Sequence, residues 1–379
     1  MGTALVTAIG SFSADIVIKR LHAAGEKVVG SDIYARELVA DALSVDAFYQ
    51  APYTSDRERY ASFVAGVCEA EGVDYICPLT DVDVDFFNAA RAVDGTFAGA
   101  LVCISPASAL AYCRDKQAMA GFLERSSSGV RGIETRPLPS LGSGPASFPV
   151  VVKPKDGRSS QGLRYVHDER EWAELSSIPD PERYVVQPLV EGRVVCVDVV
   201  RAAAGDACVA VPRREYLRTL NGAGTSVEVF HDADLEAASC ALAAELGVVG
   251  CVNFEFIEEG PDGRVPEPGT PSARFSAADA ASAALAADAA CAAEAGRAPA
   301  APASFSPEGA VRGRGLSRYH FLECNPRFSG GVEFSCIAAY DCVTNHLRAF
   351  RGESIEPLGP WRAQFIARKY EEYVTRLED

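Results

Sequence analysis

The chain has 379 residues, 48% of them hydrophobic, which is enough for two or three domains with their own cores. Its 36 basic and 52 acidic residues give a formal net charge of −16, which argues against nucleic acid or an anionic membrane as a partner. No apolar run approaches the roughly 18 residues of a membrane helix, and the opening residues do not have the pattern of a signal peptide. The 12 cysteines lie in apolar segments without a CxxC motif, so we expect reduced thiols in a cytoplasmic protein.

Residues 1–113 predict a small α/β domain. Its first elements are expected to be a strand, a helix and a second strand, over residues 4–9, 14–24 and 27–32. Asp32 follows the second strand, as in a dinucleotide-binding domain, but the turn at residues 10–13 lacks the GxGxxG fingerprint. NAD binding is therefore the weaker interpretation.

Two further strands are expected in this domain, at residues 75–79 and 101–104. Residues 80–85, between them, carry three acidic side chains where a helix begins. Acidic side chains at that position cap the helix or contact the amine of a substrate, and capping is the simpler interpretation.

A helix is expected from Lys116 to about residue 125, followed by a Ser-, Gly- and Pro-rich loop over residues 126–146. Residues 148–153 then form a strand with Lys153 at its end, and a polar, glycine-containing loop over residues 156–162 leads to another strand. Such a loop presents backbone N–H groups to phosphates while a lysine supplies a point charge. Taken alone, the pattern indicates only a hairpin, and it is not a Walker A loop.

Basic side chains gather after the strands expected at residues 184–188 and 194–200. Arg213, Arg214 and Arg218 stand out in a chain of net charge −16. Basic residues protect exposed strand edges, but they also bind phosphate and carboxylate groups, and we favour the second role. A helix is expected over residues 234–247.

Two later strands end in oxygen-bearing side chains. Glu255 lies in the apolar strand 250–257, where a carboxylate is costly unless it is paired or binds a metal. Glu323 and Asn325 follow an apolar, aromatic run, and side chains two apart on a strand share one face. Carboxylate and amide oxygens suit Mg²⁺, and Arg327 adds a fixed cation nearby. The alternative is a strand that ends in a Pro/Gly turn with solvated charges.

Residues 260–315 form an insert that is rich in Ala, Gly and Pro and offers almost no large apolar side chain to a core. We expect a surface excursion there, whose closure cost grows only logarithmically with length. A helix over residues 340–352, and then a strand and a charged helix over residues 363–378, are expected to end the chain.

The two metal motifs, Asn253-x-Glu255 and Glu323-x-Asn325-Pro-Arg327 with its following Ser-Gly-Gly, resemble the metal-binding core of the ATP-grasp superfamily, of the carbamoyl-phosphate-synthase-like kind. The resemblance extends over most of the chain. It implies an α/β architecture, in which an N-terminal Rossmann-like domain (1–113) precedes a two-subdomain α+β ATP-grasp fold. The subdomains would be residues 114–185 and residues 186–379, the second with the insert 260–315.

The resemblance also implies ATP as cofactor, with Lys116 and Lys153 on its phosphates. It implies a lid over the triphosphate, made by Gly157, Ser159, Ser160, Gln161 and Gly162. Adenosine would contact Gln187, Leu189 and Glu191. The chain departs from the family here, since an acidic pair usually stands at 187–188 and a glutamate at Val194.

The reaction that the resemblance implies is ligation of a small-molecule carboxylate to an amine or another nucleophile through an acyl phosphate. Glu255, Glu323 and Asn325 would hold Mg²⁺ or Mn²⁺, and Arg327, with Arg213 and Arg214, would stabilise charge on the transferring group. Two alternatives stay open: a carbamoyl-phosphate-type or carboxylating enzyme that acts on bicarbonate, and a nucleotide-binding protein with a degenerate active site. A homodimer is compatible with each of these.

Overall fold

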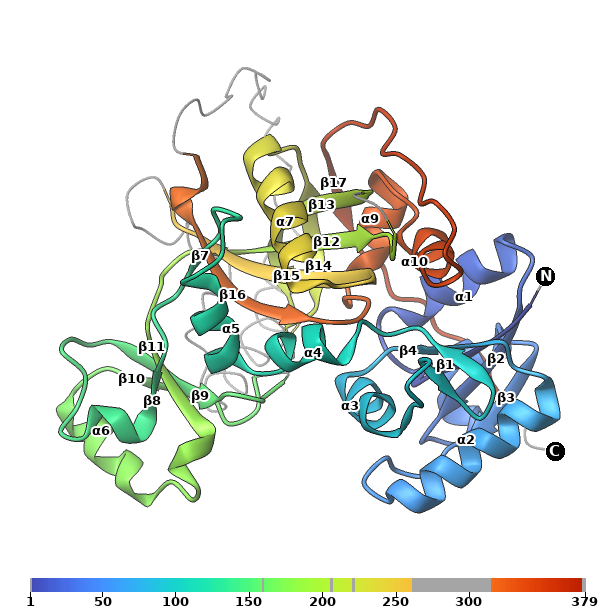
Figure 1. Cartoon of the computed structure of the whole chain (residues 1–379), viewed down its shortest axis with the longest axis horizontal. Coiled ribbons are helices and arrows are strands. Elements are labelled where there is room, and N and C mark those ends of the chain that lie inside the picture. The colour runs from blue at the N-terminus through green and yellow to red at the C-terminus, as the bar shows by residue number, and fades with distance from the viewer. Residues whose placement is uncertain (1, 159, 205–206, 220–221, 261–314, 377–379) are drawn as a thin grey trace, which may run out of the picture.

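The structure is a computed structural model that describes residues 2–158, 160–204, 207–219, 222–260 and 315–376 (Figure 1). The described residues form three sheets, here called the N-terminal, small and large sheets. The N-terminal sheet and the small sheet lie on opposite sides of the large one (Figure 1). No helix in the described ranges is both long enough and apolar enough to cross a membrane.

The N-terminal sheet has the strand order β3-β2-β1-β4-β6-β5, and its neighbours are parallel except for β5 and β6. Its strands are β1 (Thr3–Thr7), β2 (Lys27–Asp32), β3 (Ala47–Gln50), β4 (Tyr75–Pro78), β5 (Thr96–Phe97) and β6 (Ala100–Val102). The accompanying helices are α1 (Ala14–Ala23), α2 (Arg57–Glu71), α3 (Asp81–Ala90) and α4 (Ala107–Cys113).

The acidic segment at residues 80–85 divides into two roles. Thr80 caps α3 by accepting a hydrogen bond from the N–H of Asp83. Asp83 is buried and accepts hydrogen bonds from the hydroxyls of Thr7, Tyr60 and Thr80, so it stabilises the domain from within. Asp81, the first residue of α3, lies instead on the wall of the cavity described below.

The small sheet has the order β10-β9-β11-β8. Its elements are β8 (Arg136–Pro137), β9 (Val150–Pro154), β10 (Arg164–Val166), α6 (Glu169–Glu174) and β11 (Tyr184–Pro188). It has a hydrophobic core of its own, which includes Val152, Val166 and Val186. The boundary expected at residues 185 and 186 falls inside β11, which pairs with β9 along its length.

The large sheet has the order β17-β14-β13-β12-β15-β16-β7. Its strands are β7 (Arg131–Gly132), β12 (Arg193–Arg201), β13 (Cys208–Arg218), β14 (Gly224–Val229), β15 (Gly250–Glu258), β16 (Tyr319–Asn325) and β17 (Gln364–Ala367). The helices associated with it are α5 (Lys116–Leu123), α7 (Ala233–Leu246), α9 (Val332–Ala338) and α10 (Cys342–Phe350).

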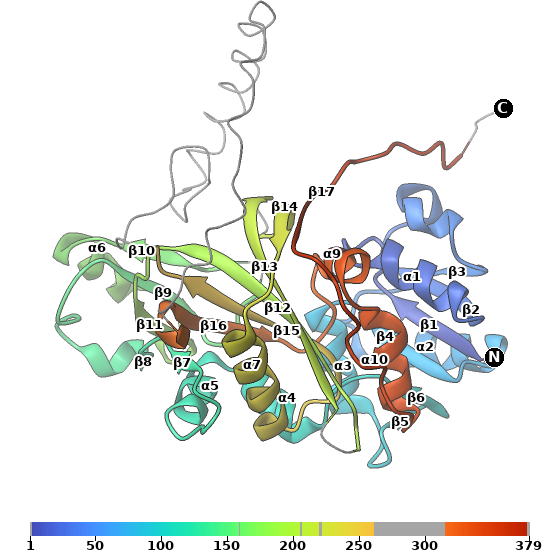
Figure 2. The same cartoon turned by 90° about the horizontal axis from the view of Figure 1, so that it is seen from above.

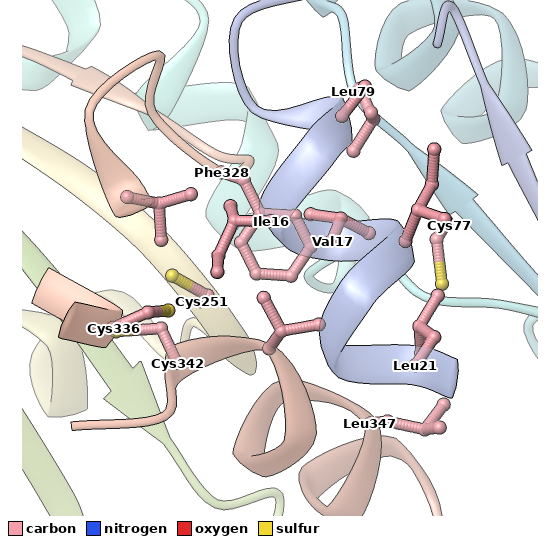
Figure 3. Close-up of a cluster of buried hydrophobic side chains, with 14 of the residues drawn as sticks. Ile16, Val17, Leu21, Cys77, Leu79, Cys251, Phe328, Cys336, Cys342 and Leu347 are labelled. Carbon is pink, nitrogen blue, oxygen red and sulfur yellow. The ribbon is translucent and has the colours of Figure 1, made fainter. Parts of the chain in front are cut away.

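A shared apolar core joins the N-terminal sheet to the large sheet. The side chains of Ile16, Val17 and Leu21 on α1 pack with Phe328 and with Leu347 of α10 in this cluster (Figure 3). Because one core serves both sheets, their relative position is held by apolar contacts and not by a linker alone.

Several expectations differ from the structure. Residues 126–146 contain the short strands β7 and β8, and α9 was not predicted. The charged helix expected near the C-terminus was wrong, because residues 368–376 are not helical: the chain pairs β17 with β14 and then continues without regular structure. The insert 260–315 lies outside the described residues except for its first and last positions.

Candidate functional site

A cavity of about 470 Å³ opens where the three sheets meet. Its walls come from the loops after β1, β4 and β16, from the β9–β10 hairpin, and from β12, β13 and β15. The predicted site residues on its wall are Lys116, Lys153, Gly157, Ser160, Gln161, Arg213, Glu255, Glu323, Asn325 and Arg327. The tertiary structure therefore gathers residues from Lys116 to Arg327 into one site.

The predicted metal ligands lie side by side on two antiparallel strands. The register of β15 and β16 places Glu255 opposite Glu323 and Asn253 opposite Asn325. Asn325 Nδ2 donates a hydrogen bond of 3.1 Å to Glu255 Oε1. Burial and the neighbouring Glu323 raise the pKa of Glu255 to about 7, as expected for two carboxylates that share a site without a bound cation.

Two lysines stand against these carboxylates. Lys116 Nζ lies 3.3 Å from Glu323 Oε2 and donates a hydrogen bond of 2.8 Å to the Gly157 carbonyl. Burial alone would raise the pKa of Glu323, but Lys116 and Lys153 together lower it. Burial lowers the pKa of Lys153 to about 8. The two lysines therefore stabilise the charged form of Glu323, and Lys116 also links this carboxylate to the glycine-containing loop.

The donor set fits a hard divalent cation. Glu255, Glu323 and Asn325 offer oxygen ligands, and the buried Asn253 has an Oδ1 atom without a hydrogen-bond partner on the same face of β15. The described residues contain no group of three or more His, Cys, Asp or Glu that could hold a metal, so the predicted set combines two carboxylates with amide oxygens. Mg²⁺ suits such a site, because it retains waters and accepts phosphate oxygens.

Glu215 and Arg218, both on β13, lie on the cavity wall. Arg218 was favoured as a ligand of phosphate or carboxylate groups, whereas Glu215 was not predicted. Arg218 Nε lies 2.6 Å from Glu215 Oε2, and its Nη2 lies 3.6 Å from Glu255 Oε2. The register of β13 against β14 shifts between Glu215 and Arg218, so this irregularity returns Arg218 to the face of Glu215. Plain strand alternation from Arg213 would have placed Arg218 on the opposite face.

Arg214, expected near the phosphates, does not line the cavity. Its guanidinium pairs with Glu258 and Glu228 and lies 3.5 Å from the centre of the Phe230 ring. Residues 213 and 214 are consecutive on a strand, so only one of them can face the site. Arg214 therefore stabilises the other face of the large sheet.

Arg213 faces the site and belongs to a buried hydrogen-bond network. Asp198 accepts hydrogen bonds from Arg213, from Ser329 Oγ at 2.8 Å and from Ser335 Oγ at 2.7 Å. The guanidinium lies so close to Gly331 that a Cβ there would be 2.8 Å from Arg213 Nε. Asp198 and Arg213 thereby hold the Ser-Gly-Gly turn after β16. The sequence analysis did not predict these contacts.

Arg327 connects the large sheet to the N-terminal sheet across the cavity. Its Nη2 donates a hydrogen bond of 3.0 Å to Asp81 Oδ2, and Arg114 lies 3.5 Å from the other carboxylate oxygen. Burial would raise the pKa of Asp81, but the two arginines lower it, so Asp81 remains an anion. Asp81 therefore fixes the guanidinium of Arg327 at the wall of the cavity.

One of the expected adenosine contacts, Gln187, lies on a much smaller cavity. A second cavity, of about 10 Å³, includes Gln187 in its lining and shares Lys116, Leu322 and Glu323 with the large one. That volume corresponds to about one water molecule. Gln187 Nε2 donates a hydrogen bond of 2.8 Å to Thr135 Oγ1.

Three other predicted nucleotide contacts are not on a cavity wall. Leu189 and Glu191 line neither cavity, and Gly162 lies in the loop beside Pro154 without lining one. Ser159 lies outside the described residues. The residues predicted to contact the phosphates therefore lie mostly on one cavity, and those predicted to contact the adenosine do not.

No family model and no curated protein matches the sequence. Solved structures match nearly its full length. Biotin carboxylase from Campylobacter jejuni, solved with an ATP analogue, superposes with a TM-score of 0.66 at 14% identity over 94% of this chain and 72% of that chain. N5-carboxyaminoimidazole ribonucleotide synthetase, solved with ADP, does so with a TM-score of 0.63 at 13% identity, over 97% and 81%. N5-carboxyaminoimidazole synthetase from Staphylococcus aureus gives 0.60 at 14%, over 94% and 78%. These matches support a mixed α/β fold of the ATP-grasp kind, and they test neither the carbamoyl-phosphate-synthase-like subfamily nor the expected Rossmann-like arrangement of residues 1–113.

Proposed function

We propose that the protein is an ATP-dependent ligase that activates a small-molecule carboxylate as an acyl phosphate and transfers the acyl group to an amine or a related nucleophile. The observation that carries this proposal is the cavity itself. Glu255, Glu323 and Asn325 supply an oxygen site for Mg²⁺ directly beside Lys116 and Lys153. Phosphoryl transfer requires this combination of charge neutralisation and positioning more than it requires a covalent nucleophile.

In this proposal Glu255, Glu323 and Asn325 would hold Mg²⁺, which would supply positive charge to neutralise the phosphates. Lys153 and Lys116 hold the triphosphate, and the loop over residues 156–162 excludes water from it. A carboxylate oxygen of the substrate attacks the γ-phosphorus, and the bond to ADP breaks. The nucleophile then attacks the acyl carbon, loses a proton and displaces phosphate. Arg327 stabilises the negative charge that develops on the acyl oxygen, and Asp81 holds its guanidinium in place.

Different parts of the chain would bind the substrate and the nucleotide. We propose that residues 1–113 shape the substrate end, because the loops after β1 and β4 line the cavity opposite the metal ligands. Residues 114–185 and 186–379 would enclose the nucleotide, with Gln187 at its base end.

The proposal is tested by ADP release from the purified protein with Mg-ATP and a panel of carboxylic acids, with and without amines. Hydroxylamine in the assay should trap an acyl phosphate as a hydroxamate. ADP release that requires an acid and yields its hydroxamate supports the ligase. Nucleotide binding without turnover across a broad panel would favour a nucleotide-binding protein instead.

A carboxylating enzyme is the second candidate, because the similar structures include a biotin carboxylase. Bicarbonate should be included in the panel as an acid of its own. ADP release that depends on bicarbonate, and that no other acid supports, would select this candidate.

A further inference from the structure

The end of the described chain forms an exposed strap, residues 362–376. It contains β17, the edge strand of the large sheet, which pairs only with β14. After β17 the strap runs in extended form along the outside of the molecule (Figure 2). Its far end is fixed to the N-terminal domain, where Thr375 Oγ1 donates a hydrogen bond of 2.6 Å to the Glu37 carbonyl and Arg376 lies 3.5 Å from the Glu37 carboxylate.

The strap exposes several large apolar side chains although it is anchored at both ends. The side chains of Phe365, Tyr370, Tyr373 and Val374 are 72%, 57%, 58% and 76% exposed. Within the described residues, the backbone of residues 369–376 makes no hydrogen bond to another backbone group. An extended segment with free N–H and C=O groups and apolar side chains is a template for another strand.

The order of charges in the strap favours one particular partner, which is a second copy of itself. In an antiparallel pair centred on Tyr370, Lys369 lies opposite the partner copy's Glu371 and Ile366 opposite its Val374. The charge pair and the apolar pair each form twice because the arrangement has a two-fold axis. Opposite charges and apolar side chains directly across a strand pair are each stabilising.

Neighbouring registers do not have this property. Residues directly opposite each other must face the same side of the sheet, so the axis of a symmetric pair passes through a residue. An axis through Lys369 places that lysine opposite its own copy, and an axis through Glu371 does the same with the carboxylate. Like charges directly opposite are destabilising, so the sequence selects Tyr370 over these neighbours.

The charge of the strap also permits the approach. The chain as a whole has a formal net charge of −16, so two copies repel each other over most of their surfaces. The strap instead carries four basic residues against two acidic ones, Glu371 and Glu372. It is therefore a place where two copies meet without local repulsion between acidic surfaces.

We propose that residues 366–374 form the contact between two copies of this chain, as an antiparallel strand pair about Tyr370 that joins the two large sheets edge to edge. The contact does not depend on the ligase activity proposed above, and neither stands or falls with the other.

Sedimentation velocity across roughly 1–100 µM protein tests the contact. The wild-type chain is expected to show a concentration-dependent dimer. Lys369→Glu should weaken the dimer about tenfold, since it replaces two attractive pairs by two repulsive ones. The double variant Lys369→Glu, Glu371→Lys reverses each pair and should restore the wild-type dissociation constant. Arg170→Glu on α6, at the far side of the small sheet, makes the same change in net charge and should leave the dimer unchanged.

Thermal melting monitored by circular dichroism confirms that each variant is folded, which is expected because the exchanged side chains are exposed. A wild-type chain that is monomeric throughout the concentration range would overturn the proposal. So would a dimer that Lys369→Glu does not weaken, or one that the double variant does not restore, because either result would place the contact on another surface.

Discussion

The two cavities at the site differ greatly although they share Lys116, Leu322 and Glu323. The large cavity, predicted to hold the phosphates, has a volume of about 470 Å³. The small cavity, predicted to lie at the base, has a volume of about 10 Å³. The large cavity lies where the three sheets meet, and two of these, the N-terminal and large sheets, share one apolar core (Figure 3). The narrow end lies against the small sheet, which packs around its own core.

This difference predicts which part of the site moves when a nucleotide binds. A body with its own core moves as a unit at little cost to its packing, whereas two bodies with a common core do not separate without exposing it. We therefore expect the predicted metal position on β15 and β16 to be preformed, and we expect the small sheet, which carries Lys153, to move when a nucleotide base enters.

Removing a metal ligand should have the largest effect, because it acts on the preformed end. Glu323→Gln deletes one ligand charge and keeps the shape of the side chain, so we expect ADP release to fall by roughly 100-fold or more with little change in melting temperature. Mn²⁺ affinity, measured by electron paramagnetic resonance, should fall in parallel. Glu259→Gln, at a half-exposed position next to β15, is the matched control. Near-normal ADP release by a folded Glu323→Gln protein would remove the metal assignment.

Filling the narrow end should separate the base from the phosphates. Ala120 lines the small cavity, so Ala120→Trp should occupy the space that the base requires and weaken ATP binding at least about tenfold. Tripolyphosphate, which has no base, should bind as it does to the wild type. Gln117→Trp on the exposed side of the same helix controls for the added ring. Equal losses for both ligands would show that the two ends are not independent.

The loop over residues 156–162 should respond to nucleotide by closing. Lys116 and Asp85 hold it in the structure, through the Gly157 carbonyl and Arg158. We expect trypsin to cut after Arg158 in the free protein, and saturating Mg²⁺ with a non-hydrolysable ATP analogue to slow this cut roughly fivefold. Cleavage at the same rate with and without nucleotide would indicate an ordinary surface hairpin.

The smallest effect should appear as a pH dependence at the phosphate end. Burial lowers the pKa of Lys153 to about 8, so its charge is lost as the pH rises through 8. ADP affinity measured by calorimetry should fall roughly two- to threefold above that pH. Lys153→Arg, which stays charged, should not show the decline.

The stability of the protein should change in the opposite direction. The unfolded chain keeps its lysine proton up to about pH 10.5 and the folded chain only to about pH 8, so the unfolded state binds more protons in this window. The Lys153 contribution to the free energy of unfolding therefore rises between these pH values. Affinity and stability that rise or fall together there would contradict the assignment.

The sequence alone determined those parts of the site that depend on neighbours along the chain. Glu323 and Asn325 share a face because side chains alternate with a period of two on a strand, and Lys153 precedes a glycine-containing hairpin for equally local reasons. The resemblance carried by these motifs was sufficient to predict the ATP-grasp fold. The same alternation already separated Arg213 from Arg214, although we had placed both at the phosphates.

Only the tertiary structure decided the contacts between distant segments. Asp81 and Arg327 are 246 residues apart and meet because a shared core brings the N-terminal sheet to the large one. Arg218 enters the site through an irregularity in β13, which no local periodicity encodes. The strand expected after residue 363 is β17, which pairs with β14, and the described residues that follow it do not form the charged helix that we had expected. The physical reason is the same in each case: local propensities amount to fractions of a kcal/mol per residue, and sheet pairing and apolar burial outweigh them once the chain is folded.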